Sequence, residues 1–195
     1  YELFINGQRI GEQVLAPAPT DYRKTILYNT YDVTPQLQKE NAIGVILGNG
    51  RFYTMRQNYK PYKIPTFGYP KLRLNLIIEY TDGSRQTIAS DISWKLTTEG
   101  PIRSNNEYDG EEYDARKELG DWNRTGYDDT NWIPAGRVSI PSGTLRAQMM
   151  PGMKVTESLK PVSIRKQGDK HILDIGQNMA GWLRIRIKGQ AGDSI

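Results

Sequence analysis

The feature that most constrains the fold is an alternation of apolar and polar residues with a period of two. It is clearest between residues 71 and 80, where apolar side chains occupy every second position. Successive side chains of a β-strand point to opposite faces, so this pattern predicts a strand with one buried face. The stretch leads into Asp82-Gly83, a dipeptide typical of tight hairpin turns. We therefore expect short antiparallel strands.

The same signals recur along the chain. Strand-like residues 1–5 and 8–10 flank Asn6-Gly7, so these two segments are predicted to pair as a hairpin. Thr34-Pro35 offers an N-cap and a Pro at the first helical position, which predicts one short helical turn. Further strands are predicted over residues 25–32, 42–47, 171–175 and 182–187. The expected fold class is all-β, an antiparallel β-sandwich or jelly roll.

A group of Pro and Gly residues between positions 141 and 161 divides the chain. A linker, or a strand lying along a domain boundary, is expected around residues 145–160. Residues 1–150 then form a nearly complete N-terminal β-sandwich. Residues 151–195 supply a linker and the opening strands of a second β-domain. The residues after the linker are too few to build a sandwich core alone, so this second domain is expected to be truncated.

Composition excludes several kinds of site. The 195 residues include no Cys and one His, which excludes disulfides, Cys-ligated zinc and any site with two His ligands. Lys and Arg (26) exceed Asp and Glu (22) by only four, which is weak support for a nucleic-acid partner. No apolar run approaches the roughly 20 residues of a membrane helix. Both ends stop in strand-like or turn-like sequence, so we expect a piece of a larger protein.

The densest group of functional side chains is the acidic segment 107–114. It holds five carboxylates and two tyrosines in eight residues, types that bind a hard cation or hydrogen-bond sugar hydroxyls. A glycosidase needs two carboxylates about 5–10 Å apart, a separation that the sequence does not define. The alternative is a solvated loop whose charges pair with Arg103, Arg116 and Lys117. The sequence leaves both interpretations open.

Two aromatic segments offer further contacts. Gly48-Asn49-Gly50 follows a predicted strand and lets the backbone turn sharply, so Arg51 and Phe52 are expected at the sandwich rim. Trp122 and Trp132 lie in an acidic, turn-rich stretch. They either stack on a sugar ring or close the bottom of the core, and the core interpretation is favoured. The single His171 is predicted to be structural or exposed rather than a general base.

Five ordered segments together resemble a known family. The passage from Tyr31-Asp32-Val33-Thr34 to residues 41–45 resembles galactose-binding-like jelly rolls of large glycosidases. The other segments are 1–7, 15–22, 100–116 and 174–182. The set resembles the N-terminal region of bacterial α-L-rhamnosidases of glycoside hydrolase family 78, over nearly the whole chain. The resemblance implies that residues 1–150 correspond to the family's N-terminal sandwich without its first strand.

The resemblance also implies a function. The family hydrolyses terminal α-L-rhamnose with inversion in an (α/α)6 barrel, and nothing here matches the barrel's acidic motif. No catalytic residue is therefore expected in this chain. Some members carry a related sandwich that binds rhamnose with help from calcium, which implies a carbohydrate site and Ca²⁺ as its cofactor. The residues predicted for that site are Asp21, Asn49, Arg51, Phe52, Asp109 and Glu111. Members often have Trp after the Leu-Gly-x-Gly turn, where this chain has Arg51-Phe52.

A second hypothesis is a purely structural module without sugar affinity. Its partner would be the rest of its own chain, namely the catalytic barrel and the second β-domain. Exposed apolar residues around Met149, Met150 and Trp182 would favour it. A rhamnosylated glycan is the external partner that the first hypothesis predicts. Glycan degradation implies a periplasmic or extracellular location.

Overall fold

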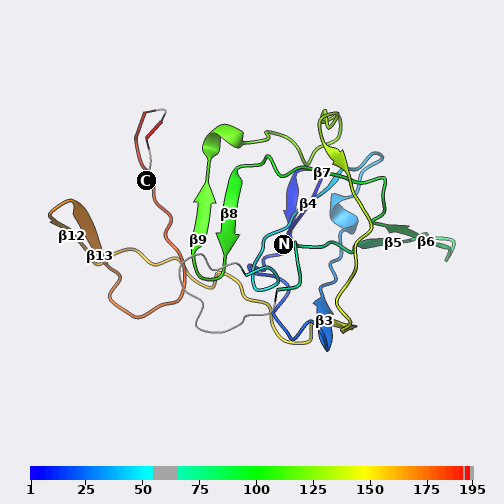
Figure 1. The fold of residues 1–195 in the computed structure, drawn as a ribbon, viewed down its shortest axis with the longest axis horizontal. Helices are drawn as coiled ribbons and strands as arrows, with labels where there is room; N and C mark the ends of the chain where they lie inside the picture. Colours follow the sequence, from blue (N-terminus) through cyan, green and yellow to red (C-terminus); the bar gives the residue numbers. More distant parts are fainter. Residues whose placement is uncertain (55–65, 191, 194–195) are drawn as a thin grey trace. The chain divides into compact units, whose positions relative to one another are not determined.

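The computed structural model describes residues 1–54, 66–190 and 192–193. Short β-strands and turns dominate it, with two helical turns, η1 (Thr34–Gln36) and η2 (Ala115–Lys117) (Figure 1). The chain divides into two compact units, unit 1 (residues 1–154) and unit 2 (residues 155–195). No helix in the described ranges is long and apolar enough to cross a membrane.

The described strands confirm the all-β prediction. In unit 1 they are β1 (Glu2–Ile5), β2 (Gln8–Ile10), β3 (Thr25–Tyr28), β4 (Ile43–Ile46), β5 (Asn75–Glu79), β6 (Arg85–Ala89), β7 (Lys95–Leu96), β8 (Ile102–Asn106), β9 (Gly110–Tyr113), β10 (Ile133–Pro134) and β11 (Thr144–Ala147). Unit 2 contains β12 (Ser163–Gln167) and β13 (Lys170–Asp174). The pairings between them are antiparallel, except that β11 runs parallel to β3.

A three-stranded sheet in the order β2-β1-β4 carries the small core of unit 1. Its buried side chains are Ile5, 2% exposed, and Ile10, 9% exposed. Asn6 and Gly7 both have positive φ, 52° and 82°, as a favoured two-residue hairpin turn requires. The Asn6 amide donates to the Gln36 carbonyl and accepts from the Ala42 N–H, both at 2.9 Å. The predicted pairing of residues 1–5 with 8–10 is thus confirmed.

Aromatic rings pack against this sheet. The Phe4 and Trp122 rings meet edge-on at 5.6 Å, and Trp122 stacks on Trp132 at 6.3 Å. Gly44 on β4 makes room for the indole, because an added Cβ would lie 2.5 Å from Trp122 Cζ3. The Tyr127 and Trp132 rings meet edge-on, with 5.8 Å between their centroids. These contacts support the interpretation of both tryptophans as core residues.

Several predicted elements differ from the observed ones. The strand expected over 25–32 ends at Tyr28, and the one expected over 71–80 covers only Asn75–Glu79. Within that strand Leu76 and Ile78 are half-buried and Ile77 is exposed, so its one-sided character is as predicted. Residues 182–187 form no strand in the part of the chain that the structure describes. Alternation alone is insufficient, because a strand requires a hydrogen-bonded neighbour.

The predicted helical turn is present, but its cap differs. Thr34 is the first residue of η1 rather than its N-cap, and the Val33 side chain in the cap position provides no hydrogen bond. The Asp32 carboxylate instead accepts from the Thr34 N–H at 3.0 Å. The Asp32 side chain, in an Asx-type turn, thus provides the hydrogen bond at the start of η1 that we expected from the Thr34 side chain.

Near the end of unit 1, strand β11 pairs in parallel with strand β3. Gly143 fits closely there, because an added Cβ would lie 2.4 Å from the Tyr22 carbonyl oxygen. Gln148 Oε1 then accepts from the Ala18 N–H at 3.0 Å, and the Val14 N–H donates to the Met153 carbonyl at 2.8 Å. The segment expected as a linker or boundary strand thus begins as a paired strand.

The contact between Gly44 and Trp122 predicts a sharp size limit. Gly44→Ala should lower the free energy of unfolding by about 1–3 kcal/mol, because the new methyl group overpacks the indole. Gly136→Ala is the matched control, since nothing lies within 4 Å of an added Cβ there. Urea unfolding followed by tryptophan fluorescence measures both variants. Equal stability of the two would contradict the packing described.

Candidate functional site

The loop that follows β4 is fixed to the end of β8. The Asn49 N–H donates to Asn105 Oδ1, and Asn49 Nδ2 donates to the Asn105 carbonyl, both at 2.9 Å. The Tyr53 N–H donates to the Asn49 carbonyl at 3.0 Å and closes a turn. We call residues 49–52, 105–109 and Tyr22 the rim cluster. It includes four of the six predicted site residues, Asn49, Arg51, Phe52 and Asp109.

Arg51 is bound to Glu107 at two points. Its Nε lies 3.0 Å from Glu107 Oε2 and its Nη2 lies 2.6 Å from Oε1, a bidentate geometry. These hydrogen bonds raise the pKa of the Arg51 guanidinium. The two side chains are 50% and 36% exposed, so solvent screening keeps the pair's contribution to stability small. A sugar hydroxyl at Arg51 would have to compete with this pair.

Phe52 lies inside an aromatic group. Tyr22 and Phe67 meet its ring at 5.1 and 5.5 Å, and Lys71 Nζ lies 4.8 Å from its centroid. Lys71 also donates to the Phe67 carbonyl at 2.6 Å, which fixes the ammonium over the ring. Burial raises the pKa of the Tyr22 phenol. The Phe52 face covered by Lys71 is therefore already engaged, whereas we expected this ring to stack on a sugar.

The remaining predicted residues are held by their own local segments. Asp21 pairs with Arg23 at 2.9 and 3.1 Å, and that hydrogen bonding lowers the pKa of the Asp21 carboxyl. Asp109 Oδ2 accepts from Asn106 Nδ2 at 3.0 Å in the β8–β9 turn. Glu111 lies exposed on β9, opposite Asn105. Tyr22, the residue after Asp21, packs its ring against Phe52, and this contact links the Asp21 segment to the rim cluster.

The acidic residues do not fit calcium in this arrangement. Calcium takes six to eight oxygen ligands. Across residues 1–54, 66–190 and 192–193, no three Asp, Glu or His side chains gather in a way that could hold a metal ion. Asp21 and Glu107 are each neutralised by an arginine instead. Calcium therefore has no part in the function proposed below.

The sequence did not identify Asn105 or Lys71 as members of this region. Asn105 lies 56 positions from Asn49, and no local pattern signals a contact over that separation. The hairpin dipeptide that closes the β8–β9 turn, Asp109-Gly110, was the available clue, because it places the end of β8 beside the acidic segment. Gly110 has a φ of 80°, which only glycine adopts readily.

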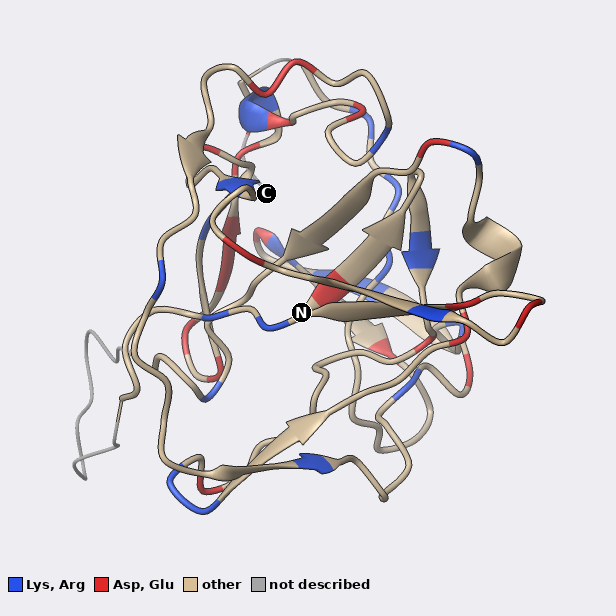
Figure 2. Ribbon diagram, turned by 90° about the vertical axis from the view of Figure 1, so that its right-hand side faces the viewer, with Lys and Arg blue, Asp and Glu red and all other residues tan. Residues whose placement is uncertain are grey.

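The solvated-loop interpretation of the acidic segment holds for one of its three proposed pairs. Arg116 pairs with Asp114 at 2.8 Å, whereas Lys117 and Arg103 both approach Glu99. Basic and acidic residues are interspersed along the ribbon in Figure 2. His171 lies exposed on β13, and exposure was one of the two alternatives that we predicted for it, the other being a structural role.

The Asp114 carboxyl offers a direct test of these pairs. Hydrogen bonds from Arg116 lower its pKa to about 2, against about 3.9 in an unfolded chain. The stability gained from this shift is present above about pH 4 and is lost as the pH falls towards 2. An NMR titration should show the low pKa, and Arg116→Gln should raise it towards 3.9. Arg23→Gln is the control and should leave it unchanged. An ordinary pKa in the unmodified chain would contradict the pairing.

Two family models match the chain. One, described as the α-L-rhamnosidase N-terminal domain, matches residues 1–157. The other, described as the bacterial α-L-rhamnosidase concanavalin-like domain, matches residues 164–195. An α-L-rhamnosidase of Formosa agariphila is 41% identical over 201 residues, which cover 100% of this chain and 21% of that protein.

Solved structures agree. The native α-L-rhamnosidase from Aspergillus terreus aligns with a TM-score of 0.87 and 41% identity, over 97% of this chain and 22% of its own. The Streptomyces avermitilis α-L-rhamnosidase complexed with L-rhamnose aligns with a TM-score of 0.75 and 33% identity, over 91% of this chain and 17% of its own. The chain thus spans about a fifth of the length of the proteins it matches.

Proposed function

The chain belongs to the α-L-rhamnosidase N-terminal domain family, and from this we propose that it is the non-catalytic N-terminal region of an α-L-rhamnosidase, a module that packs against the rest of that enzyme. The parent enzyme would hydrolyse terminal α-L-rhamnose from a glycan, outside the cytoplasm. The observation that carries the packing function is the amount of apolar surface that the chain leaves exposed.

The exposure of apolar side chains is most pronounced in unit 2. None of its described residues is buried. Eight of its large apolar side chains are between 49% and 70% exposed: Val155, Val162, Ile164, Met179, Trp182, Leu183, Ile185 and Ile187. Its only described sheet is the β12–β13 hairpin, and an isolated hairpin is at best marginally stable in water. This unit requires partner strands that the described residues do not supply.

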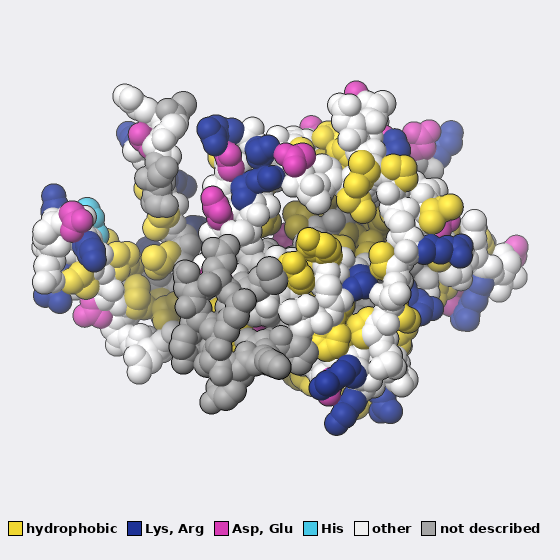
Figure 3. Space-filling model, viewed as in Figure 1, with side chains coloured by type: hydrophobic (Ala, Val, Ile, Leu, Met, Phe, Trp, Pro, Cys, Tyr) yellow, Lys and Arg dark blue, Asp and Glu magenta, His cyan; other side chains and the backbone are white. Residues whose placement is uncertain are grey.

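Unit 1 also exposes apolar residues near its end. Met149 is 95% exposed, Met150 55% and Met153 49%. Methionine side chains adapt to irregular partner surfaces and are enriched at interfaces. Apolar side chains are visible on the surface of the molecule in Figure 3. Met149 and Met150 in unit 1 and Trp182 in unit 2, which we predicted as contact residues, are thus each solvent-exposed.

Sugar binding at the rim cluster is the second candidate function. The L-rhamnose complex of the Streptomyces avermitilis relative favours it at the level of the whole enzyme. Within the rim cluster, however, Arg51 is paired with Glu107, Asn49 with Asn105, and Lys71 covers a face of Phe52. A ligand would have to displace these contacts, so packing is the function that the geometry supports better.

The packing function predicts a local change in hydrogen exchange. In the 195-residue chain the β12 and β13 amides should exchange at least about tenfold faster than in the longer natural polypeptide, because partner strands protect them only there. The β1 amides, which are paired within unit 1, serve as the internal control and should exchange equally in both. Equal protection of β12 and β13 in the two samples would contradict the proposal.

The second candidate is tested separately by titration calorimetry with L-rhamnose, with and without Ca²⁺. Because internal contacts already occupy the rim side chains, any binding heat with L-rhamnose should be the same in Arg51→Ala as in the unmodified chain. Glu107→Gln loosens the Arg51 pair and serves as the comparison. Heat in the unmodified chain that disappears in Arg51→Ala would establish a sugar site at the rim cluster and restore the second candidate.

A further inference from the structure

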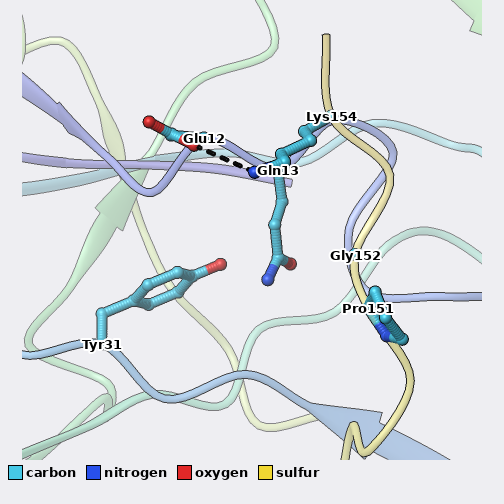
Figure 4. A pocket seen from close by; sticks show the side chains of 6 residues that line it. All are labelled: Glu12, Gln13, Tyr31, Pro151, Gly152 and Lys154. Carbon is cyan, nitrogen blue, oxygen red and sulfur yellow. Dashed lines mark ion pairs between the residues drawn. The ribbon is translucent and has the colours of Figure 1, made fainter. Parts of the chain in front are cut away.

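A cavity of about 300 Å³ lies in unit 1, and no residue of the rim cluster lines it (Figure 4). Its lining comes from three separate segments: Glu12 and Gln13, Tyr31, and the stretch Pro151, Gly152 and Lys154. Backbone contacts fix these walls. Gln13 and Lys154 form an antiparallel bridge, and the Val14 N–H donates to the Met153 carbonyl at 2.8 Å.

The Gln13 side chain has an unfilled acceptor. Its Oε1 is buried and has no hydrogen-bond partner among the described residues. A buried acceptor without a partner is costly, so native structures keep one mainly where a water or a ligand completes it. Gly152 permits the arrangement, because an added Cβ would lie 2.5 Å from Gln13 Cδ. In Figure 4 the Gln13 amide and the Tyr31 hydroxyl point towards the same space.

Tyr31 supplies a fixed aromatic wall. Its hydroxyl shares a hydrogen bond with the Tyr1 hydroxyl at 3.1 Å, and the Tyr1 hydroxyl lies 3.1 Å from Asn29 Oδ1. Gly11 lets the ring approach the backbone, since an added Cβ there would lie 2.6 Å from Tyr31 Cε1. A ring held in this way presents an apolar face together with a polar edge.

The charged residues at the cavity cancel one another. Lys154 Nζ and Glu12 Oε2 lie 3.8 Å apart, farther than a direct hydrogen bond, and the side chains are 58% and 85% exposed. Such a pair can offer both a donor and an acceptor to a ligand without adding net charge. A neutral ligand rich in hydroxyl groups fits this chemistry better than an anion or a cation does.

We propose that this cavity binds one ring of a neutral polyhydroxylated ligand, a single monosaccharide unit. A ligand hydroxyl donates to Gln13 Oε1, Glu12 and Lys154 bind further hydroxyls, and Tyr31 and Pro151 contact the C–H face. The volume is at the lower end of ligand pockets, about 300–1,000 Å³, which suits one ring rather than an oligosaccharide. The site shares no residue with the rim cluster, and its wall of Pro151, Gly152 and Lys154 adjoins Met150 and Met153 in the chain.

The test uses the 195-residue chain with L-rhamnose, D-galactose and myo-inositol as probes, followed by saturation-transfer difference NMR. At least one probe should bind, and Gln13→Leu should weaken that binding roughly five- to tenfold while leaving the melting temperature equal or higher. Glu12→Gln, at an exposed position, should weaken the same binding without affecting folding.

Gln36→Leu is the matched control. Gln36 Oε1 is also buried without a partner among the described residues, but Gln36 does not line the cavity. This variant should show the same thermal behaviour as Gln13→Leu and unchanged binding, and Arg51→Ala should also bind normally. The proposal is overturned if no probe binds or if binding survives Gln13→Leu. It is also overturned if Gln13→Leu melts well below Gln36→Leu, because Gln13 would then have an internal partner.

Discussion

The seating of Trp122 against Gly44 is the contact on which unit 1 depends. The three-stranded sheet buries only Ile5 and Ile10 among the described apolar side chains, so the indole supplies much of what covers it. Through Trp132 and Tyr127 the same ring connects the sheet to the segment that follows η2. A side chain at position 44 would push that ring away from the sheet.

The last strand of unit 1 is joined to the early part of the chain by polar and backbone contacts. Strand β11 runs back along β3, and Gln148 binds both Ala18 and Asn29 across the join. These are mainly polar and backbone contacts, which fix geometry but contribute little net stability each. Apolar side chains that a self-sufficient domain would bury are exposed instead, in both units. These exposed side chains are the basis of our proposal that the chain packs against further structure.

The sequence predicted what local chemistry determines. Asn6-Gly7 specified its hairpin because both residues must adopt positive φ, and the alternation within 75–79 matched the half-buried face of β5. The motifs also identified the family correctly. The pairing of Asn49 with Asn105 and the parallel return of β11 could not be predicted, because each joins segments far apart with no local signal.

One expectation failed for a physical reason, and the expected sugar site stays a prediction. Residues 182–187 alternate as a strand does but lack a paired neighbour in the described chain, so their pattern indicates a partner rather than a finished element. The expected ligand set of the sugar site was chosen by residue type alone. Residue type does not show whether an arginine or a carboxylate is free, and two charged members of that set, Arg51 and Asp21, are paired internally with Glu107 and Arg23.

The central claim is that this chain leaves uncovered a surface that the rest of a rhamnosidase covers. Sedimentation velocity of the 195-residue chain over a range of concentrations tests it most directly. We predict self-association that grows with concentration and that weakens when Trp182 and Leu183 are replaced by Ser. A monomer at every concentration, with β12 and β13 folded and stable, would contradict the account.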